Sequence, residues 1–116
     1  MSVYVTPVSS VFLPVSVKAF SAITGVPDGI ETTILTYAPI GDETIGDFIL
    51  GGSDYARFNI YINTFLQFVI RSGPSRNASL QLQRPIQFGL GDIIDIKVVH
   101  YYTAATADFE ATILGI

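Results

Sequence analysis

The chain of 116 residues contains no cysteine and no tryptophan, and only 14% of its residues are charged. Without cysteine it cannot form a disulfide, a zinc–thiolate site or a thiol nucleophile. A typical soluble domain has about 25% charged residues, and lysine is especially scarce here, with two beside six tyrosines and eight phenylalanines. Protein interfaces are depleted in Lys and Glu and enriched in aromatic residues. The composition therefore favours a surface that contacts partners over one that is merely uncharged.

Basic runs and long apolar runs are also absent. The net charge is −4 and the four arginines are scattered, so the sequence lacks the phosphate-neutralising patch of a nucleic-acid-binding protein. The first 17 residues carry no charge, but Pro7 and Pro14 interrupt them, and the segment lacks a basic start and a continuous apolar core. We therefore expect neither a signal peptide nor a membrane helix in this segment.

What the sequence does contain is a period of two, and no segment of helical length shows a sustained 3.6-residue period. In residues 57–63, Phe58, Ile60 and Ile62 alternate with mainly polar residues. Residues 65–71 follow as a second strand that is apolar on both faces. In this strand Leu66, Phe68 and Ile70 are predicted to share one face. The intervening Asn63-Thr64 is predicted to be a tight turn between antiparallel strands.

Turn signals divide the whole chain in the same way. Clusters of Gly, Pro, Asp and Ser separate about eight short strands, the pattern expected for an antiparallel sandwich or barrel. We predict one all-β domain, a β-sandwich over residues 15–116, preceded by an extended N-terminal arm or edge strand over residues 1–14. The expected strands are 15–23, 30–37, 47–50, 57–63, 65–71, 79–83 with a continuation at 86–88, 93–101 and 108–113.

Catalytic chemistry finds little support. His100 is the only histidine, so a Ser/His/Asp triad would need it as the base, yet it lies in a strand pattern beside tyrosines and no Gly-x-Ser-x-Gly motif is present. We expect His100 to pack in the interior. The acidic residues Asp42, Glu43 and Asp47 share one predicted loop, but their spacing does not match an EF-hand; a structural calcium ion there remains the alternative to a solvated loop. We expect no enzyme activity, no cofactor and no catalytic metal.

Aromatic and apolar side chains are the remaining candidates for function. Tyrosines suit a protein interface because they offer large contact area at low entropic cost, whereas a sugar-stacking platform usually includes tryptophan. The arm of residues 1–14 could add a strand to a neighbouring subunit. The candidate interface residues are Val3, Tyr4, Val5, Val11, Phe12, Leu13, Tyr55, Tyr61, Phe65, Tyr101 and Tyr102.

Three segments carry a resemblance to a known group of proteins. Residues 52–63 form a small polar turn and a strand ending in Asn, residues 91–98 begin with Gly-Asp and continue as a strand, and residues 109–115 form a strand ending near Gly. This pattern resembles small jelly-roll structural proteins of tailed-phage virions and also occurs in some carbohydrate-binding sandwiches.

The resemblance implies a jelly-roll sandwich in a non-enzymatic virion protein, located in the virion. A head-decoration (cement) protein fits best: a homotrimer that binds the major capsid protein across capsid subunits. A baseplate, tail-fibre or receptor-binding module is the runner-up within virions. A carbohydrate-binding module that takes a glycan is the alternative from another class. No membrane or nucleic-acid partner is implied.

Overall fold

The computed structural model describes residues 15–73, 76–101 and 105–116. These residues form strands and connecting turns, and the predicted arm of residues 1–14 lies outside them. The strands are β2 (Ser16–Pro27), β3 (Thr32–Tyr37), β4 (Glu43–Gly52), β5 (Ala56–Ile62), β6 (Phe65–Ser72), β7 (Arg76–Phe88), β8 (Ile94–His100) and β9 (Thr106–Gly115).

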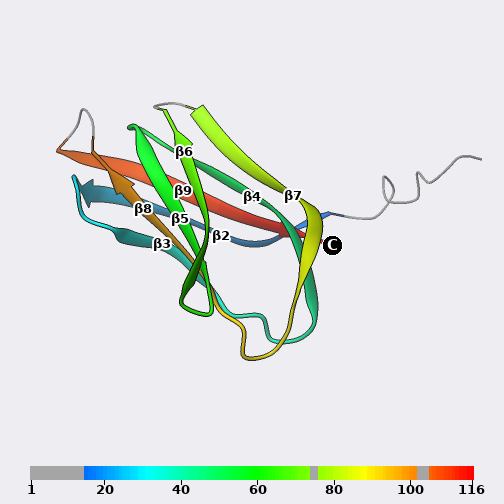
Figure 1. The fold of residues 1–116 in the computed structure, drawn as a ribbon. Helices are drawn as coiled ribbons and strands as arrows, with labels where there is room; N and C mark the ends of the chain where they lie inside the picture. Colours follow the sequence, from blue (N-terminus) through cyan, green and yellow to red (C-terminus); the bar gives the residue numbers. More distant parts are fainter. Residues whose placement is uncertain (1–14, 74–75, 102–104) are drawn as a thin grey trace, which may run out of the picture.

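Two four-stranded sheets lie face to face (Figure 1). Their strand orders are β2-β9-β4-β7 and β3-β8-β5-β6, and all neighbouring strands pair antiparallel. Every connection except β5–β6 passes from one sheet to the other. That wrapping is the double-sheet jelly roll, so the predicted eight-stranded all-β sandwich is confirmed.

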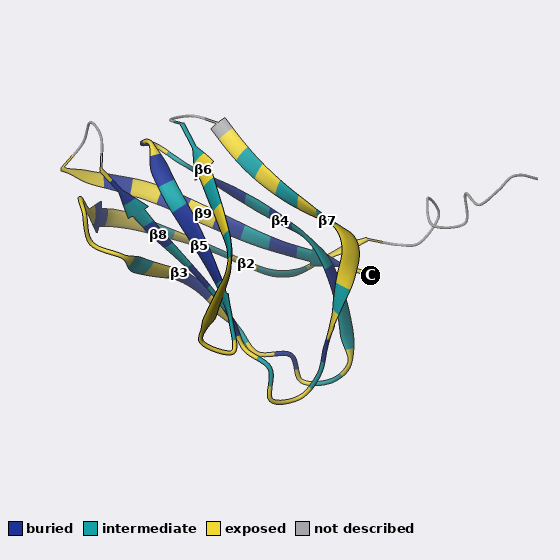
Figure 2. Ribbon diagram, in the orientation of Figure 1, coloured by how far each residue is buried: buried dark blue, intermediate teal, exposed yellow. Residues whose placement is uncertain are grey.

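The core lies between the sheets and is built from alternating positions of the strands. In β8 every second residue, from Ile94 to His100, is buried, and β9 alternates in the same way from Ala107 to Gly115 (Figure 2). Aromatic rings join the two layers: Phe58 of β5 meets Phe109 of β9 edge-on, with the ring centroids 5.8 Å apart. Edge-to-face packing is a favoured geometry for aromatic pairs. The period-two pattern therefore correctly identified the buried faces of the central strands.

The β5–β6 hairpin turns at Asn63 and Thr64, as predicted. Both residues have positive φ, 51° and 72°, which is the signature of a type I′ turn, whose twist matches that of the flanking strands. The Asn63 side chain fastens this turn to the β7–β8 loop, because its amide donates to Asp92 and its Oδ1 accepts the Ile93 N–H at 2.8 Å.

Several strand limits differ from the prediction. β4 begins at Glu43 within the predicted acidic loop, and it continues through Gly51 and Gly52, which were expected to form a turn. Gly52 is required there because a Cβ would overlap the ring of Phe109. β2 extends to Pro27 through a register shift after Ile23. Glycine and proline residues that usually form turns can therefore lie within a strand, where a bulge or the absence of a side chain permits strand pairing.

The proline signal was also misleading in β7, which passes through Pro85. Proline is tolerated because β7 is the outer strand of its sheet and need not donate on both sides. In β6, a register shift opposite Ile60 and Tyr61 pairs Leu66 with Tyr61. Leu66 therefore lies on the outer face, and its predicted grouping with the inward residues of β6 was wrong.

Candidate functional site

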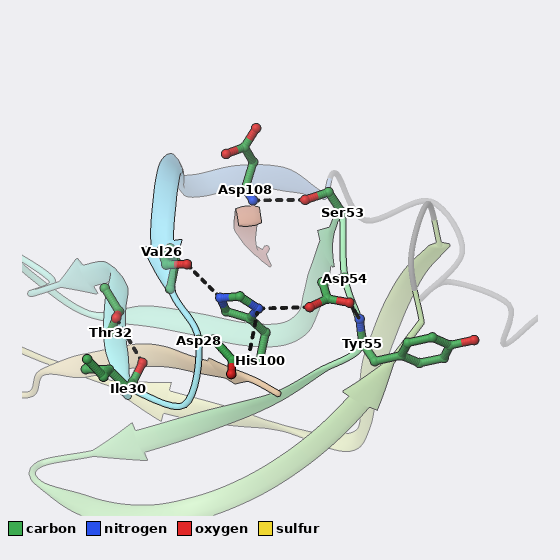
Figure 3. Close-up of polar contacts among 9 residues, drawn as sticks. All are labelled: Val26, Asp28, Ile30, Thr32, Ser53, Asp54, Tyr55, His100 and Asp108. Atoms are coloured by element: carbon green, nitrogen blue, oxygen red, sulfur yellow. Dashed lines mark hydrogen bonds and ion pairs between the residues drawn. The ribbon is translucent and has the colours of Figure 1, made fainter. Parts of the chain in front are cut away.

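His100 and Asp54 form a completely buried polar pair at one end of the sandwich (Figure 3). His100 ends β8, and Asp54 lies in the β4–β5 connection, so the pair joins segments 46 residues apart. The imidazole Nδ1 is 2.9 Å from Asp54 Oδ2, and Nε2 is 2.6 Å from the Val26 carbonyl oxygen of β2. The other carboxylate oxygen of Asp54 accepts the Tyr55 N–H.

Both ring nitrogens of His100 face acceptors, so the protonated imidazolium satisfies both contacts. Burial alone would lower the pKa of His100, but the hydrogen bonds to Asp54 and Val26, with the negative charges of Asp54 and Asp28, raise it above 6.5. Opposite charges and hydrogen bonds to the charged form have this effect. The pair is therefore a buried ion pair whose hydrogen-bonding groups all have partners.

This geometry leaves His100 no role as a general base. A triad base needs one ring nitrogen within reach of a nucleophile, but both nitrogens are occupied and the ring is buried. The nearby Ser53 hydroxyl accepts the Asp108 backbone N–H instead, as Figure 3 shows. The expectation that His100 packs in the interior is confirmed.

The predicted acidic loop does not gather its carboxylates. Glu43 lies in β4, where its carboxylate accepts the Tyr37 hydroxyl at 2.6 Å. Burial and this carboxylate raise the pKa of Tyr37 to about 12. Over residues 15–73, 76–101 and 105–116, no three Asp, Glu or His side chains are grouped closely enough to hold a metal ion. In the same residues, no helix has the length and apolar character needed to span a membrane.

The outer face of sheet β3-β8-β5-β6 carries an open groove of about 740 Å³. Cross-strand neighbours over β6, β5 and β8 line most of it, namely Arg71–Arg57–Val99, Val69–Asn59 and Leu66–Tyr61, together with Gly29 and Glu31. Lys97 and Asp95 continue the second and third of these rows on β8. Side chains that are directly opposite across paired strands share one face and contact one another. The groove is therefore cationic at one end and apolar along β6; we call it the β6 groove.

A polar network runs along the side of the β6 groove opposite β6. Glu31 Oε2 accepts from the Asn59 amide at 2.7 Å and from the Tyr61 hydroxyl at 2.8 Å. Burial would raise the pKa of Glu31, but these bonds and the charges of Lys97 and Arg57 lower it. The Lys97 ammonium lies 5.0 Å from the centre of the Tyr61 ring, a cation–π distance. Tyr61 is thus held in place by its own neighbours.

The predicted interface residues do not form one patch. Tyr61 is half-buried in the β6 groove and Phe65 is exposed at the start of β6. Tyr55 and Tyr101 are exposed, following the ends of β4 and β8 respectively. The others, Val3, Tyr4, Val5, Val11, Phe12, Leu13 and Tyr102, lie outside the described residues.

Two features of the β6 groove were missed by sequence reasoning. The alternation placed Asn59 on the strand face opposite Phe58 and Ile60, but it did not indicate that Asn59 is only 3% exposed there, with an Oδ1 that has no partner in the described structure. Arg57 and Arg71 lie directly opposite each other, although the arginines appeared scattered. The predicted hairpin contained a signal for this pair, because a two-residue turn at Asn63-Thr64 places residues 57 and 71 nearly opposite each other on the two strands.

The second exposed apolar feature is β2. It pairs only with β9, and along its other edge no strand of the described structure is hydrogen-bonded. Val17 and Phe20 are 60% and 58% exposed, and Val15 just before the strand is similarly exposed. Edge strands usually carry charges or prolines that prevent pairing with other chains. The only charged residue from Val15 to Phe20 is Lys18, although a register shift beside Lys18 interrupts the pairing of this segment with β9.

No protein-family model matches the chain, and no curated protein matches it. Among solved structures, the chain is similar to the CBM36-1 domain of a multidomain xylanase from the hindgut metagenome of Trinervitermes trinervoides. The likeness has 15% sequence identity and a TM-score of 0.42, and it covers 83% of this chain and 94% of that one.

Proposed function

We propose that this chain is a non-enzymatic structural protein of a virion, and specifically a capsid decoration protein that binds across capsid subunits as a homotrimer. The observation that carries the proposal is the exposed apolar edge of β2. A long strand with unpaired main-chain groups and exposed Val17 and Phe20 suits strand addition to another copy.

The other edge of the same sheet provides a contrast. β7 carries Arg84 and Pro85 and alternates glutamines with leucines, and these are features that discourage edge-to-edge pairing. β2 lacks such protection at its N-terminal end apart from Lys18 and the adjacent register shift. The asymmetry supports association through β2 instead of indiscriminate aggregation through both edges. In a trimer, β2 of each copy would contact a surface other than β2 on the next copy, because pairing of two β2 edges closes at a dimer.

The proposed mechanism is multivalent binding. A trimer presents the same capsid-binding surface three times, and each further contact forms at the high effective concentration set by the first. Individually weak contacts then hold the decoration protein on the shell. The jelly-roll topology is found in capsid proteins, and the resemblance of residues 52–63, 91–98 and 109–115 to phage virion proteins supports this setting.

The test is the mass of the full chain in solution, measured by sedimentation equilibrium over a range of concentrations. We expect three times the 12.6 kDa chain mass. Phe20→Glu should shift the population toward monomer, because a charge on the edge strand opposes pairing. Leu90→Glu is the matched control at another exposed apolar position, 83% exposed in the β7–β8 loop. A wild-type monomer at all concentrations, or equal dissociation by both variants, would contradict the proposal.

A carbohydrate-binding module is the second candidate, favoured by the planar polar side chains of Asn59, Glu31 and Tyr61 in the β6 groove. A glycan-binding screen tests it, with Tyr61→Ala as the variant and Tyr55→Ala and Tyr101→Ala as controls. Binding that only Tyr61→Ala abolishes would favour the module over the decoration protein. Capsid, portal or tail genes beside the coding gene would favour the virion.

A further inference from the structure

Arg57 and Arg71 in the β6 groove form no ion pair within the described residues. The two arginines are direct cross-strand partners, and like charges in that arrangement destabilise a sheet. In the described structure the ion pairs all involve His100, so no carboxylate lies within ion-pairing distance of either arginine. Two acidic residues on this side of the sheet have other hydrogen-bond partners: Glu31 accepts from Asn59 and Tyr61, and Asp95 accepts from Thr36.

Unpartnered polar atoms mark the same place. Arg57 Nε, a donor, and Asn59 Oδ1, an acceptor, are both buried without a hydrogen-bond partner in the described structure. Such groups are rare in folded proteins, and each requires an explanation such as an absent ligand. A cationic donor calls for an anionic acceptor, and a carboxylate matches the planar guanidinium in two parallel hydrogen bonds. An amide acceptor calls for an N–H or O–H donor.

The rest of the groove indicates what presents the carboxylate. Leu66 and Val69 line it along β6 and are nearly half exposed, and Val99 lies beside Arg57. The Tyr61 ring, which a sugar would use for stacking, has Lys97 over it and donates its hydroxyl to Glu31. A surface that combines apolar side chains with Arg and Tyr is typical of a protein interface.

We propose that the β6 groove binds an extended acidic segment of a partner protein, with Arg57 and Arg71 receiving a carboxylate and Leu66 and Val69 receiving the neighbouring apolar side chains. The chain's overall charge of −4 makes this local excess of cations selective, because acidic partners are repelled elsewhere on its surface. The groove lies on the sheet opposite β2, so the proposal holds or fails independently of trimer formation.

Nuclear magnetic resonance of the arginine Nε–H groups tests the proposal on the full chain, which has four arginines. The probe is a capped six-residue peptide of alternating Glu and Leu, and the control peptide has Gln in place of Glu. We expect saturable shifts of the Arg57 and Arg71 signals with the Glu peptide. Arg57→Gln or Arg71→Gln should weaken its binding about tenfold or more, the loss expected for a charged hydrogen bond. Arg84→Gln, which changes an exposed arginine on β7, should leave the affinity unchanged.

Other outcomes overturn the proposal. Equal affinity for the Gln peptide would show that the carboxylate is not recognised, and similar shifts of all four arginines would show unspecific charge attraction. A trigalacturonate titration that moves the Arg57 and Arg71 signals at lower concentration than the Glu peptide would assign the groove to an acidic glycan. Because Arg57 and Arg71 are surface residues of β5 and β6, circular dichroism of each variant verifies that the sheet remains folded.

Discussion

The His100–Asp54 pair and the Arg57–Arg71 pair lie near each other but on opposite faces of the sheet β3-β8-β5-β6. His100 is opposite Ala56 in the β5–β8 register, and Arg57 is the next residue of β5. On the inner face, His100 and Asp54 are fully buried and all their contacts are complementary. On the outer face, Arg57 opposes Arg71 without a carboxylate, and Arg57 Nε has no partner in the described structure.

The difference indicates that the His100–Asp54 pair stabilises the fold, whereas the Arg57–Arg71 pair is available to bind a partner. A buried ion pair with complementary hydrogen bonds fixes the segments that carry it, here β2, β8 and the β4–β5 connection. A cross-strand cation pair without an ion-paired carboxylate weakens the isolated sheet, and an external anion would compensate it. Substitutions at Asp54 and Arg71 and a change of pH test this distinction.

The largest effect is expected from Asp54→Ala. Removing one member of a buried ion pair leaves the other charge without compensation, at a cost of about 3–5 kcal/mol in the free energy of unfolding. Urea denaturation measures the change. Asp28→Ala is the control, because Asp28 is 51% exposed and lies 3.8 Å from His100, so its loss should cost less than about 1 kcal/mol. Equal effects of the two variants would contradict a special role for Asp54.

A smaller effect is expected from pH. The pKa of His100 is raised above 6.5 in the folded chain, so the folded state binds more protons than the unfolded state between the two pKa values. The stabilisation is complete below about pH 6.5 and is lost as pH rises through the raised pKa. Urea midpoints measured from about pH 6 to pH 9 should therefore fall. Asp54→Asn should flatten the decline, whereas a wild-type midpoint that rises over this range would contradict the assignment.

The smallest effect is expected from Arg71→Gln, and its sign is opposite. Relieving the cross-strand repulsion should raise the free energy of unfolding by roughly 0.2–0.5 kcal/mol, since both side chains have access to solvent screening. Arg84→Gln, which changes an exposed arginine without a cross-strand partner in the register, should have no measurable effect. A loss of stability in Arg71→Gln would show that Arg71 contributes to the fold.

Much of the fold could be predicted because alternation along a strand directly determines which face is buried. The residues from Ile94 to His100 in β8 follow this rule without exception, and Phe58 and Ile60 in β5 follow it although Asn59 between them is buried as well. The Asn63-Thr64 turn was predictable because the apolar pattern restarts after it. Strand limits were less predictable because bulges, such as the one after Ile23, extend pairing past Gly25.

The candidate site was less accessible to prediction because it depends on register between strands. The arginines at 57 and 71 become partners only through the hairpin, and a register shift places Leu66 beside Tyr61 on the outer face. Asn59 lies at an outward position of its strand, yet neighbouring side chains cover it. Asp54 reaches His100 through a loop, and no local pattern connects residues 46 positions apart.

A peptide-dependent stability measurement on the wild type and Arg71→Gln tests directly whether the Arg57–Arg71 pair binds a partner. With the Glu–Leu peptide at about 100 times its dissociation constant, the wild type should gain about 2.7 kcal/mol in its free energy of unfolding. Arg71→Gln should start slightly more stable and gain much less at the same peptide concentration. Equal gains in both proteins, or no gain in the wild type, would contradict the account.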